Sequence, residues 1–230
     1  MRLVLFDIDG TLLNSGGMGR ASMQRALGMV FGSPGNPSYR YDGKTDKQIV
    51  RDVMRLEGHS DEHIDARMEK LIALYLEGLR EGAKSGKFNV RPLEGVVELL
   101  DALEARDDVV LGLLTGNVES GARTKLKAAG IDPDRFRVNA FGSDHEHRPE
   151  LPAIAQRRAS ETLGLDIAGE RLVVIGDTPA DIECGRALGA RAIGVASGHY
   201  TVEQLQAHDP YAVFPSLKNT EQVLETILNA

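Results

Sequence analysis

Two aspartates, Asp7 and Asp9, follow a short apolar run, LVLF at residues 3–6. Four consecutive apolar residues of β-forming character predict a strand that is buried on both faces, as in a parallel sheet. Gly10 allows the chain to turn tightly where it leaves that strand. Two carboxylates held close together repel each other by about 4 kcal/mol at an effective dielectric constant of about 20. The pair is therefore harder to explain as ordinary turn residues than either aspartate alone.

Two later apolar runs also end in polar residues. Residues 109–114 run into Thr115, and residues 172–175 are followed by Asp177, with Asp181 one helical turn further on. Because the carboxyl ends of parallel strands lie at one edge of a sheet, where ligands bind, we expect these side chains to converge with Asp7 and Asp9. Four acidic groups in one crevice need a cation, and ligation by oxygen atoms alone suits Mg²⁺.

The rest of the chain alternates between strand and helix patterns after residue 88. Besides residues 3–6, strands are predicted over residues 109–114, 136–141, 172–175 and 190–195. Helices are predicted over residues 92–105, 120–129, 149–163, 181–188 and 219–228. This alternation predicts an α/β fold built on a doubly wound, Rossmann-like parallel sheet.

The stretch between residues 14 and 88 carries no convincing strand pattern. Residues 18–31 and residues 49–54 show helical spacing of apolar side chains, and Ser60 is a typical N-cap for a helix with an apolar stripe over residues 64–79. The sequence therefore predicts a catalytic core made of residues 1–14 and 89–230, interrupted by an all-helical domain over residues 15–88.

Composition limits the partners and the compartment. The chain has 230 residues and a formal net charge of −7, which gives no electrostatic reason to bind nucleic acid or an anionic membrane. No apolar run has the length of a signal peptide or a membrane span. The single cysteine, Cys184, suits a reducing compartment. We expect a cytoplasmic protein, either a monomer or a homodimer.

Three segments together resemble the sequence motifs of one enzyme superfamily. The segment DIDGT at residues 7–11, Thr115 after its apolar run, and GDTPAD at residues 176–181 are similar to motifs I, II and IV of the haloacid dehalogenase (HAD) superfamily. The motifs occur in the expected order, and the resemblance covers nearly the whole chain. The helical segment resembles the C1 cap domain of that superfamily, and the whole chain looks most like its phosphoglycolate-phosphatase-like branch.

The resemblance implies a Mg²⁺-dependent phosphatase that acts on a small phosphorylated metabolite. Asp7 would be the nucleophile, which forms an aspartyl-phosphate. Asp9 would be the general acid and then the general base. The metal would be held by Asp7, by the backbone carbonyl of Asp9 and by Asp177, with Asp181 either a further ligand or a support behind the ligands. The acid at position 9 favours phosphoryl transfer over dehalogenation, because a halide leaves without needing a proton.

The same resemblance places the substrate phosphate on Thr115, Gly116 and Arg148. The family usually has a lysine ahead of the helix that leads to motif IV, and Arg148 occupies that place here. Arginine keeps the positive charge and can bind phosphate bidentately. The alternatives are that Arg148 forms a surface salt bridge, or that Arg157 or Arg158 takes this role.

In the helical segment, Lys44 and Thr45 are candidates for selecting the substrate, although a solvated lysine is an equal interpretation of Lys44. Three rival functions stay open. A phosphomutase of the β-phosphoglucomutase type would use the same nucleophile, and a phosphonate hydrolase would need an amine such as Lys44. A non-catalytic receiver domain would only be phosphorylated on Asp7.

Two histidine pairs, His145 with His147 and His59 with His63, have spacings that could suit a transition metal, but neither brings a convincing third ligand.

Overall fold

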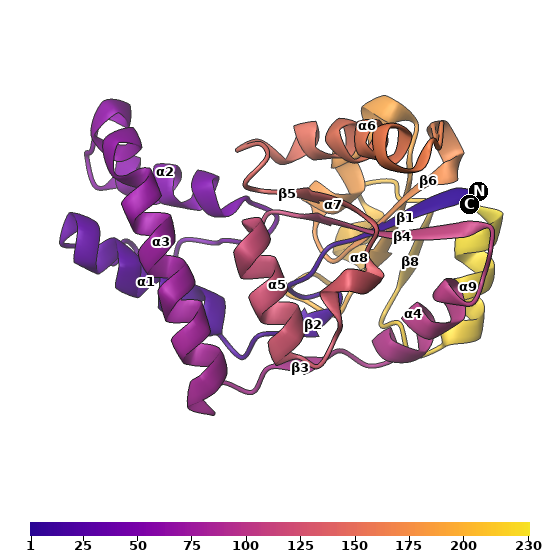
Figure 1. The fold of residues 1–230 in the computed structure, drawn as a ribbon, viewed down its shortest axis with the longest axis horizontal. Coiled ribbons are helices and arrows are strands. Elements are labelled where there is room, and N and C mark those ends of the chain that lie inside the picture. Colours follow the sequence, from indigo (N-terminus) through magenta and orange to yellow (C-terminus); the bar gives the residue numbers. More distant parts are fainter.

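The strand β1 (Arg2–Phe6) lies in the middle of a six-stranded sheet in the computed structural model, which describes residues 1–230. The strand order is β5-β4-β1-β6-β7-β8, and every pair is parallel. The remaining strands of this sheet are β4 (Val109–Thr115), β5 (Val138–Phe141), β6 (Leu172–Gly176), β7 (Arg191–Val195) and β8 (Ala212–Phe214). This order confirms the predicted doubly wound, Rossmann-like fold (Figure 1).

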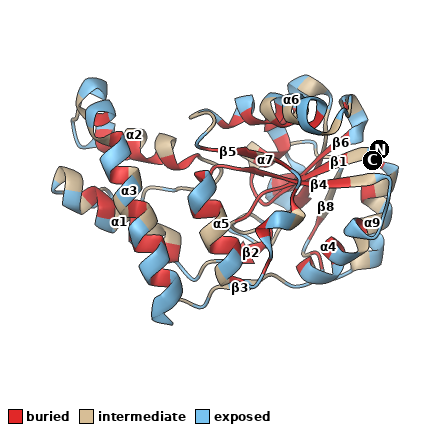
Figure 2. Cartoon of the chain, in the orientation of Figure 1, coloured by how far each residue is buried: buried red, intermediate tan, exposed pale blue.

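Helices cover both faces of the sheet because the strand residues alternate between two apolar cores. Val4 and Phe6 belong to the core beneath α4 (Val96–Glu104), α5 (Glu119–Ala128) and α9 (Thr220–Asn229). Leu3 and Leu5 belong to the core on the other face, beneath α6 (Leu151–Leu163) and α7 (Pro179–Cys184). The strands between these layers are almost completely buried (Figure 2).

The helical insert, which we define as residues 15–88, contains the helices α1 (Met18–Phe31), α2 (Asp46–Leu56) and α3 (Asp61–Ser85). These helices have an apolar core of their own, which includes the fully buried Tyr75. The insert lies beside the sheet and faces α5 (Figure 1). A two-stranded antiparallel ribbon, β2 (Leu13–Asn14) and β3 (Arg91–Pro92), joins it to the rest of the chain.

Pro92 does not open a helix, which differs from the prediction over residues 92–105. It pairs with Leu13 in the β2–β3 ribbon, and α4 begins only at Val96. The turn between them needs Gly95, which has a φ of 79° and leaves no room for a side chain: a Cβ there would lie 2.1 Å from the carbonyl oxygen of Leu217. Contact with a distant segment, which the local pattern does not report, therefore sets the start of this helix.

Several short elements were not predicted. The edge strand β8 has three residues, α8 (Val202–Gln206) has five, and both are too short for a periodic pattern. The predicted helix over residues 181–188 begins earlier, at Pro179, and ends at Cys184. Four 3₁₀ turns complete the fold: η1 (Pro133–Arg135), η2 (Arg148–Glu150), η3 (Gly169–Arg171) and η4 (Arg186–Leu188). None of the helices has the length and apolar character required to span a bilayer.

Candidate active site

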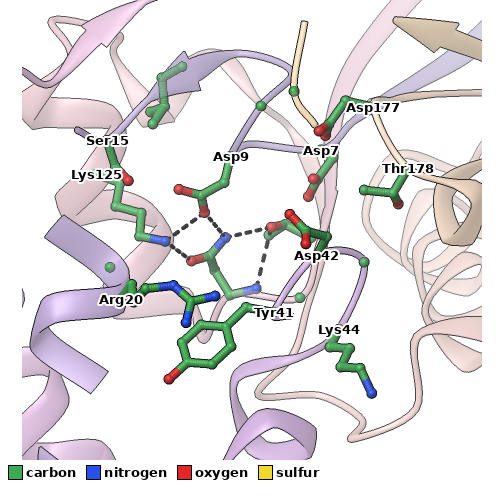
Figure 3. A pocket seen from close by; sticks show the side chains of 18 of the residues that line it. Asp7, Asp9, Ser15, Arg20, Tyr41, Asp42, Lys44, Lys125, Asp177 and Thr178 are labelled. Atoms are coloured by element: carbon green, nitrogen blue, oxygen red, sulfur yellow. Dashed lines mark hydrogen bonds and ion pairs between the residues drawn. The ribbon is translucent and has the colours of Figure 1, made fainter. Parts of the chain in front are cut away.

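The carboxyl ends of β1, β4 and β6 meet at one cavity of about 450 Å³, which lies between the sheet edge and the helical insert. Asp7 and Asp9 line this cavity after β1, Thr115 after β4, and Asp177 after β6. The structure therefore brings together the residues that the strand pattern predicted to converge (Figure 3). Asp7 is fixed at its place because its N–H donates to the Ile175 carbonyl at 2.9 Å.

Three buried carboxylates, of Asp7, Asp177 and Asp181, have oxygen atoms within 4.8 Å of one another and could hold a metal ion. Asp177 Oδ1 accepts a hydrogen bond from Thr11 Oγ1 at 3.1 Å, whereas no protein group donates to its Oδ2. Both oxygens of Asp181 are occupied, Oδ1 by Arg148 and Oδ2 by the N–H and hydroxyl of Thr178. A cation would thus find free oxygen atoms on Asp7 and Asp177, with Asp181 behind them.

The electrostatics of this cluster favour a bound cation. Burial raises the pKa of Asp7 to about 6; Arg148 opposes that shift, while the carboxylates of Asp181 and Asp9 reinforce it. Burial, followed by repulsion from Asp181 and Asp7, holds the pKa of Asp177 well above its usual range. Raised pKa values mean that the negative charges lack sufficient compensation from the protein. The donor chemistry and this charge imbalance both fit a divalent ion with oxygen ligands.

Two glycines form the space in which the Asp177 carboxylate lies. A Cβ on Gly10 would be 2.3 Å from Asp177 Oδ2, and a Cβ on Gly198 would be only 1.8 Å from the same atom. Gly10 also has a φ of 84°, which disfavours any other residue. Ser197 Oγ donates to the Gly10 carbonyl at 2.7 Å and so joins the loop after β7 to the loop after β1.

Arg148 is a buried cation, with 3% of its surface exposed, so the alternative of a solvated surface salt bridge does not hold. Its Nη2 lies 3.3 Å from Asp7 Oδ1, donates to the Leu114 carbonyl at 3.2 Å and also pairs with Asp181. Its Nε is buried without a hydrogen-bond partner, although Arg148 lines the cavity. The guanidinium group therefore has hydrogen-bonding capacity that the protein itself does not use.

The two fallback arginines do not reach this cavity. Arg157 pairs with Glu161 on the exposed side of α6, and Arg158 pairs with Asp144. Thr115 is fully buried, and its hydroxyl oxygen accepts hydrogen bonds from the backbone N–H of Asn117 at 3.3 Å and from its amide Nδ2 at 2.8 Å.

Asp9 is the most exposed of the site carboxylates, with 37% of its side chain accessible. Its Oδ2 accepts hydrogen bonds from Lys125 Nζ at 2.6 Å and from Asn117 Nδ2 at 2.9 Å (Figure 3). Lys125 also donates to Asn117 Oδ1 at 2.6 Å, so the three side chains form one closed network. Asp9 is therefore held by groups that come from β4 and α5 rather than from its own strand.

The helical insert lines the cavity with residues of all three of its helices and of the loop before α2, which carries Lys44. Thr45 Oγ1 donates to the Glu146 carbonyl at 2.6 Å and caps α2 by accepting from the Gln48 N–H at 3.1 Å. Lys44 Nζ pairs with Asp52 at 2.8 Å, and it points away from Asp7 and Asp9 (Figure 3). The side-chain groups of both candidate selectivity residues thus already have partners within the protein.

The histidine pairs lie away from this cluster. The His59 and His63 rings stack at 4.9 Å between centroids, and the His145 and His147 rings are tilted at 5.6 Å. The groups of three or more metal-ligating side chains consist of the aspartate cluster alone.

Sequence reasoning missed four residues of the site: Asn117, Lys125, Asp46 and Gly198. Gly198 could have been found because it follows a strand of the same sheet. Lys125 also left a signal, since it shares the buried face of α5 with Gly121, Ala122 and Leu126, where a lysine is unusual. Asp46 lies in the insert, and its contact with the core leaves no local pattern.

The fold and the site define a Rossmann-like α/β protein with an acidic, cation-ready active site at the carboxyl edge of its sheet. The family model for haloacid dehalogenase-like hydrolases matches residues 4–195. The chain belongs to this family, which confirms the resemblance noted in the sequence.

Relatives with known names agree with this family. The chain is 28% identical to a phosphoglycolate phosphatase of Thiobacillus denitrificans over 224 residues, covering 94% of this chain and 92% of the relative. It is 29% identical to an N-acetylmuramic acid 6-phosphate phosphatase of Pseudomonas aeruginosa, covering 90% and 87%. A hydrolase of Pseudomonas syringae has a similar fold, with a TM-score of 0.72 at 23% identity and 98% of both chains covered.

Proposed function

We propose that this hydrolase is a Mg²⁺-dependent phosphatase that cleaves a small-molecule phosphate monoester through an aspartyl-phosphate on Asp7. The observation that carries the proposal is the position of Asp7, whose Oδ1 lies 3.3 Å from Nη2 of the buried Arg148 and whose carboxylate clusters with that of the buried Asp177. A phosphate group in this place would be close to a nucleophile, to a fixed positive charge and to a candidate metal site.

The chemistry needs two steps. A carboxylate oxygen of Asp7 attacks phosphorus, the bond from phosphorus to the ester oxygen breaks, and Asp9 supplies the proton that the leaving alkoxide takes up. Asp9 then accepts a proton from a water molecule, whose oxygen attacks the same phosphorus. The bond from phosphorus to the Asp7 oxygen breaks in this second step, which releases inorganic phosphate and restores Asp7 as a carboxylate and Asp9 as an acid.

The metal would be held by Asp7, by the backbone carbonyl of Asp9 and by Asp177, with Asp181 as a support. Mg²⁺ bound there supplies positive charge that offsets the repulsion between the carboxylates and the phosphate. Thr115, Gly116 and Arg148 are the groups that we assign to the phosphoryl oxygens. Arg148 would act through its positive charge and an N–H that the protein does not already bind, since Nη2 contacts Asp7, Asp181 and the Leu114 carbonyl.

We assign residues 1–14 and 89–230 to the catalytic core and residues 15–88 to a cap domain that closes over the substrate. Closure would exclude bulk water and restrict the substrate to the size of a metabolite. The named relatives act on phosphoglycolate and on N-acetylmuramic acid 6-phosphate, both of which are small phosphate esters. In the insert, Lys44 and Thr45 stay predictions as selectivity residues. The lone thiol of Cys184 supports placing the enzyme in the cytoplasm.

A phosphonate hydrolase is less compatible with the site. Burial lowers the pKa of Lys44, but hydrogen bonds to Asp52 and Tyr39 outweigh burial and leave this pKa raised. A protonated amine does not form the Schiff base that this chemistry requires.

A phosphatase screen tests the proposal. The purified protein is incubated with a panel of small phosphate esters, with Mg²⁺ or with EDTA, and free phosphate is measured. Asp7→Asn serves as the blank. We expect phosphate release that needs both Mg²⁺ and Asp7. Activity that persists in Asp7→Asn would overturn the nucleophile assignment, and isomerisation of a sugar phosphate without phosphate release would favour a phosphomutase.

A further inference from the structure

Lys125 is a buried lysine whose ammonium group lies against the side chain of Asp9. Only 5% of its side chain is exposed, compared with 37% for Asp9. Burying a charged group is costly unless it is paired and hydrogen-bonded. The buried ammonium group of Lys125 is thus paired with one oxygen of Asp9, whose carboxylate is open to the cavity.

The contacts distinguish the two oxygens of Asp9. Oδ2 accepts from Lys125 Nζ at 2.6 Å and from Asn117 Nδ2 at 2.9 Å, whereas no protein group donates to Oδ1. Asn117 is itself fixed, because its Oδ1 accepts from Lys125 at 2.6 Å and its Nδ2 also donates to Thr115 Oγ1 at 2.8 Å. The carboxyl plane of Asp9 is therefore set from outside its own strand.

The helical insert surrounds the same ammonium group. A Cβ on Gly19 of α1 would lie 3.1 Å from Lys125 Nζ. The Asp46 carboxylate of α2 attracts Lys125, and Tyr75 of α3 lines the cavity beside both residues. Burial lowers the pKa of Lys125, but Asp9 and Asp46 outweigh burial, so the group stays charged. All three helices of the insert thus contribute to enclosing this cation.

We propose that Lys125, together with Asn117, is a positioning residue that holds Oδ2 of Asp9 and leaves Oδ1 as the oxygen that exchanges a proton with the leaving group. This inference rests on the proposed phosphatase function. The role that we assign to Lys125 needs no contact with the substrate. Lys125 acts through Asp9, and helices of the insert enclose its ammonium group.

Leaving groups of different basicity provide the test. The value of kcat/KM reports the steps up to phosphoryl transfer, in which a basic leaving group needs a proton and an acidic one does not. We compare phenyl phosphate, 4-nitrophenyl phosphate and 2,4-dinitrophenyl phosphate in excess Mg²⁺. The variants are Lys125→Met and Asn117→Ala, and Lys127→Met on the exposed side of the same helix is the matched control. Thermal unfolding of each variant is recorded alongside.

For Lys125→Met we expect kcat/KM to fall by about 100-fold with phenyl phosphate, the lower end of what general acid catalysis contributes. The loss should shrink along the series, to less than about threefold with 2,4-dinitrophenyl phosphate, which gains little from an acid. Asn117→Ala should show a smaller loss of kcat/KM that also decreases from phenyl phosphate to 2,4-dinitrophenyl phosphate. If Lys125→Met does not fold, Asn117→Ala tests the positioning role in its place. Lys127→Met should match the wild type.

An equal loss with all three esters, or no loss, would overturn the positioning role, because a merely structural effect does not depend on the leaving group. Failure of the wild type to hydrolyse any of the esters would instead count against the phosphatase proposal itself. The two failures are therefore distinguishable in one experiment.

Discussion

The carboxylate of Asp46 accepts a hydrogen bond from the N–H of Val118 at 2.8 Å, across the boundary between the helical insert and the core. Val118 precedes α5 and offers no side-chain cap of its own. The N–H of Asp46 also donates to the Gly116 carbonyl at 2.8 Å. One residue of the insert thus binds both sides of the loop that follows Thr115, and it places a negative charge at the positive end of a helix.

Replacing Asp46 by alanine should lower kcat/KM about tenfold, because a hydrogen bond to a charged group contributes about 1.5–3 kcal/mol. Steady-state kinetics on the best substrate from the screen would measure this effect. The matched control is Asp46→Asn, which keeps an oxygen that can accept from Val118 and should retain most of the activity. Equal activity of Asp46→Ala and the wild type would show that this contact does not hold the insert in its working position.

Replacing Gly198 by alanine should weaken metal binding, because the new Cβ would lie 1.8 Å from Asp177 Oδ2 in the present arrangement. Gly198 does not need a positive φ, so the backbone tolerates alanine and the fold should survive. We expect the Mg²⁺ concentration for half-maximal activity to rise at least about tenfold, the equivalent of 1.4 kcal/mol. The matched control is Gly28→Ala, because a Cβ at Gly28 would meet no other atom within 4 Å and Gly28 has no positive φ. An unchanged Mg²⁺ requirement would contradict the assignment of Asp177, in the space that Gly198 leaves for it, as a metal ligand.

Replacing Arg148 by methionine should destabilise the protein by about 3–5 kcal/mol, the range for removing one partner of a buried ion pair. The variant would leave the buried carboxyl groups of Asp7 and Asp181 without the cation that contacts both of them. Urea unfolding in EDTA measures this loss. Arg148→Lys retains the charge but cannot reproduce all of the guanidinium contacts, so its stability and activity should be intermediate. Wild-type stability of Arg148→Met would contradict the role assigned to this cation.

Asp7 should make the metal-free protein lose stability as the pH rises from about 4 to about 6, and the raised pKa values of Asp46 and Asp177 act in the same direction. The pKa of Asp7 is raised to about 6 in the folded protein, from an ordinary value of 3.8, so the folded state retains a proton that the unfolded state has lost. One such proton lowers the free energy of unfolding by about 1.4 kcal/mol for each pH unit within this window. The stabilisation is fully present at low pH and is lost above the pKa of the folded state. Carboxyls with lowered pKa values, such as Asp144, titrate below this window.

Urea unfolding in EDTA at several pH values between 4 and 7 would measure this dependence, with Asp7→Asn as the comparison. The variant has no carboxyl to titrate at that position, so the difference in unfolding free energy between variant and wild type should grow with pH up to about 6 and then level off. A difference that does not change with pH would contradict the raised pKa of Asp7.

The sheet and the strand-end residues were predictable because each depends on local patterns. A buried strand needs a run of apolar residues, and Asp7, Thr115 and Asp177 follow such runs directly. Lys125 and Asp46 were not predictable in the same way. Their partners are 116 residues away for Lys125 and Asp9, and 72 for Asp46 and Val118, and pairing at that range depends on how the insert is placed on the core. The prediction for the start of α4 was wrong for the same reason, because the backbone of the distant Leu217 determines where this helix begins.

The β2–β3 ribbon has a consequence for how this molecule can diversify. Leu13 pairs with Pro92 and Asn14 with Arg91, so the chain leaves the core and returns to it at adjacent positions. The two ends of the helical insert, residues 15–88, are therefore already side by side. Exchanging residues 15–88 for those of a relative should replace the insert and keep the sheet intact, and we expect chimaeras joined at this ribbon to have an altered choice of substrate.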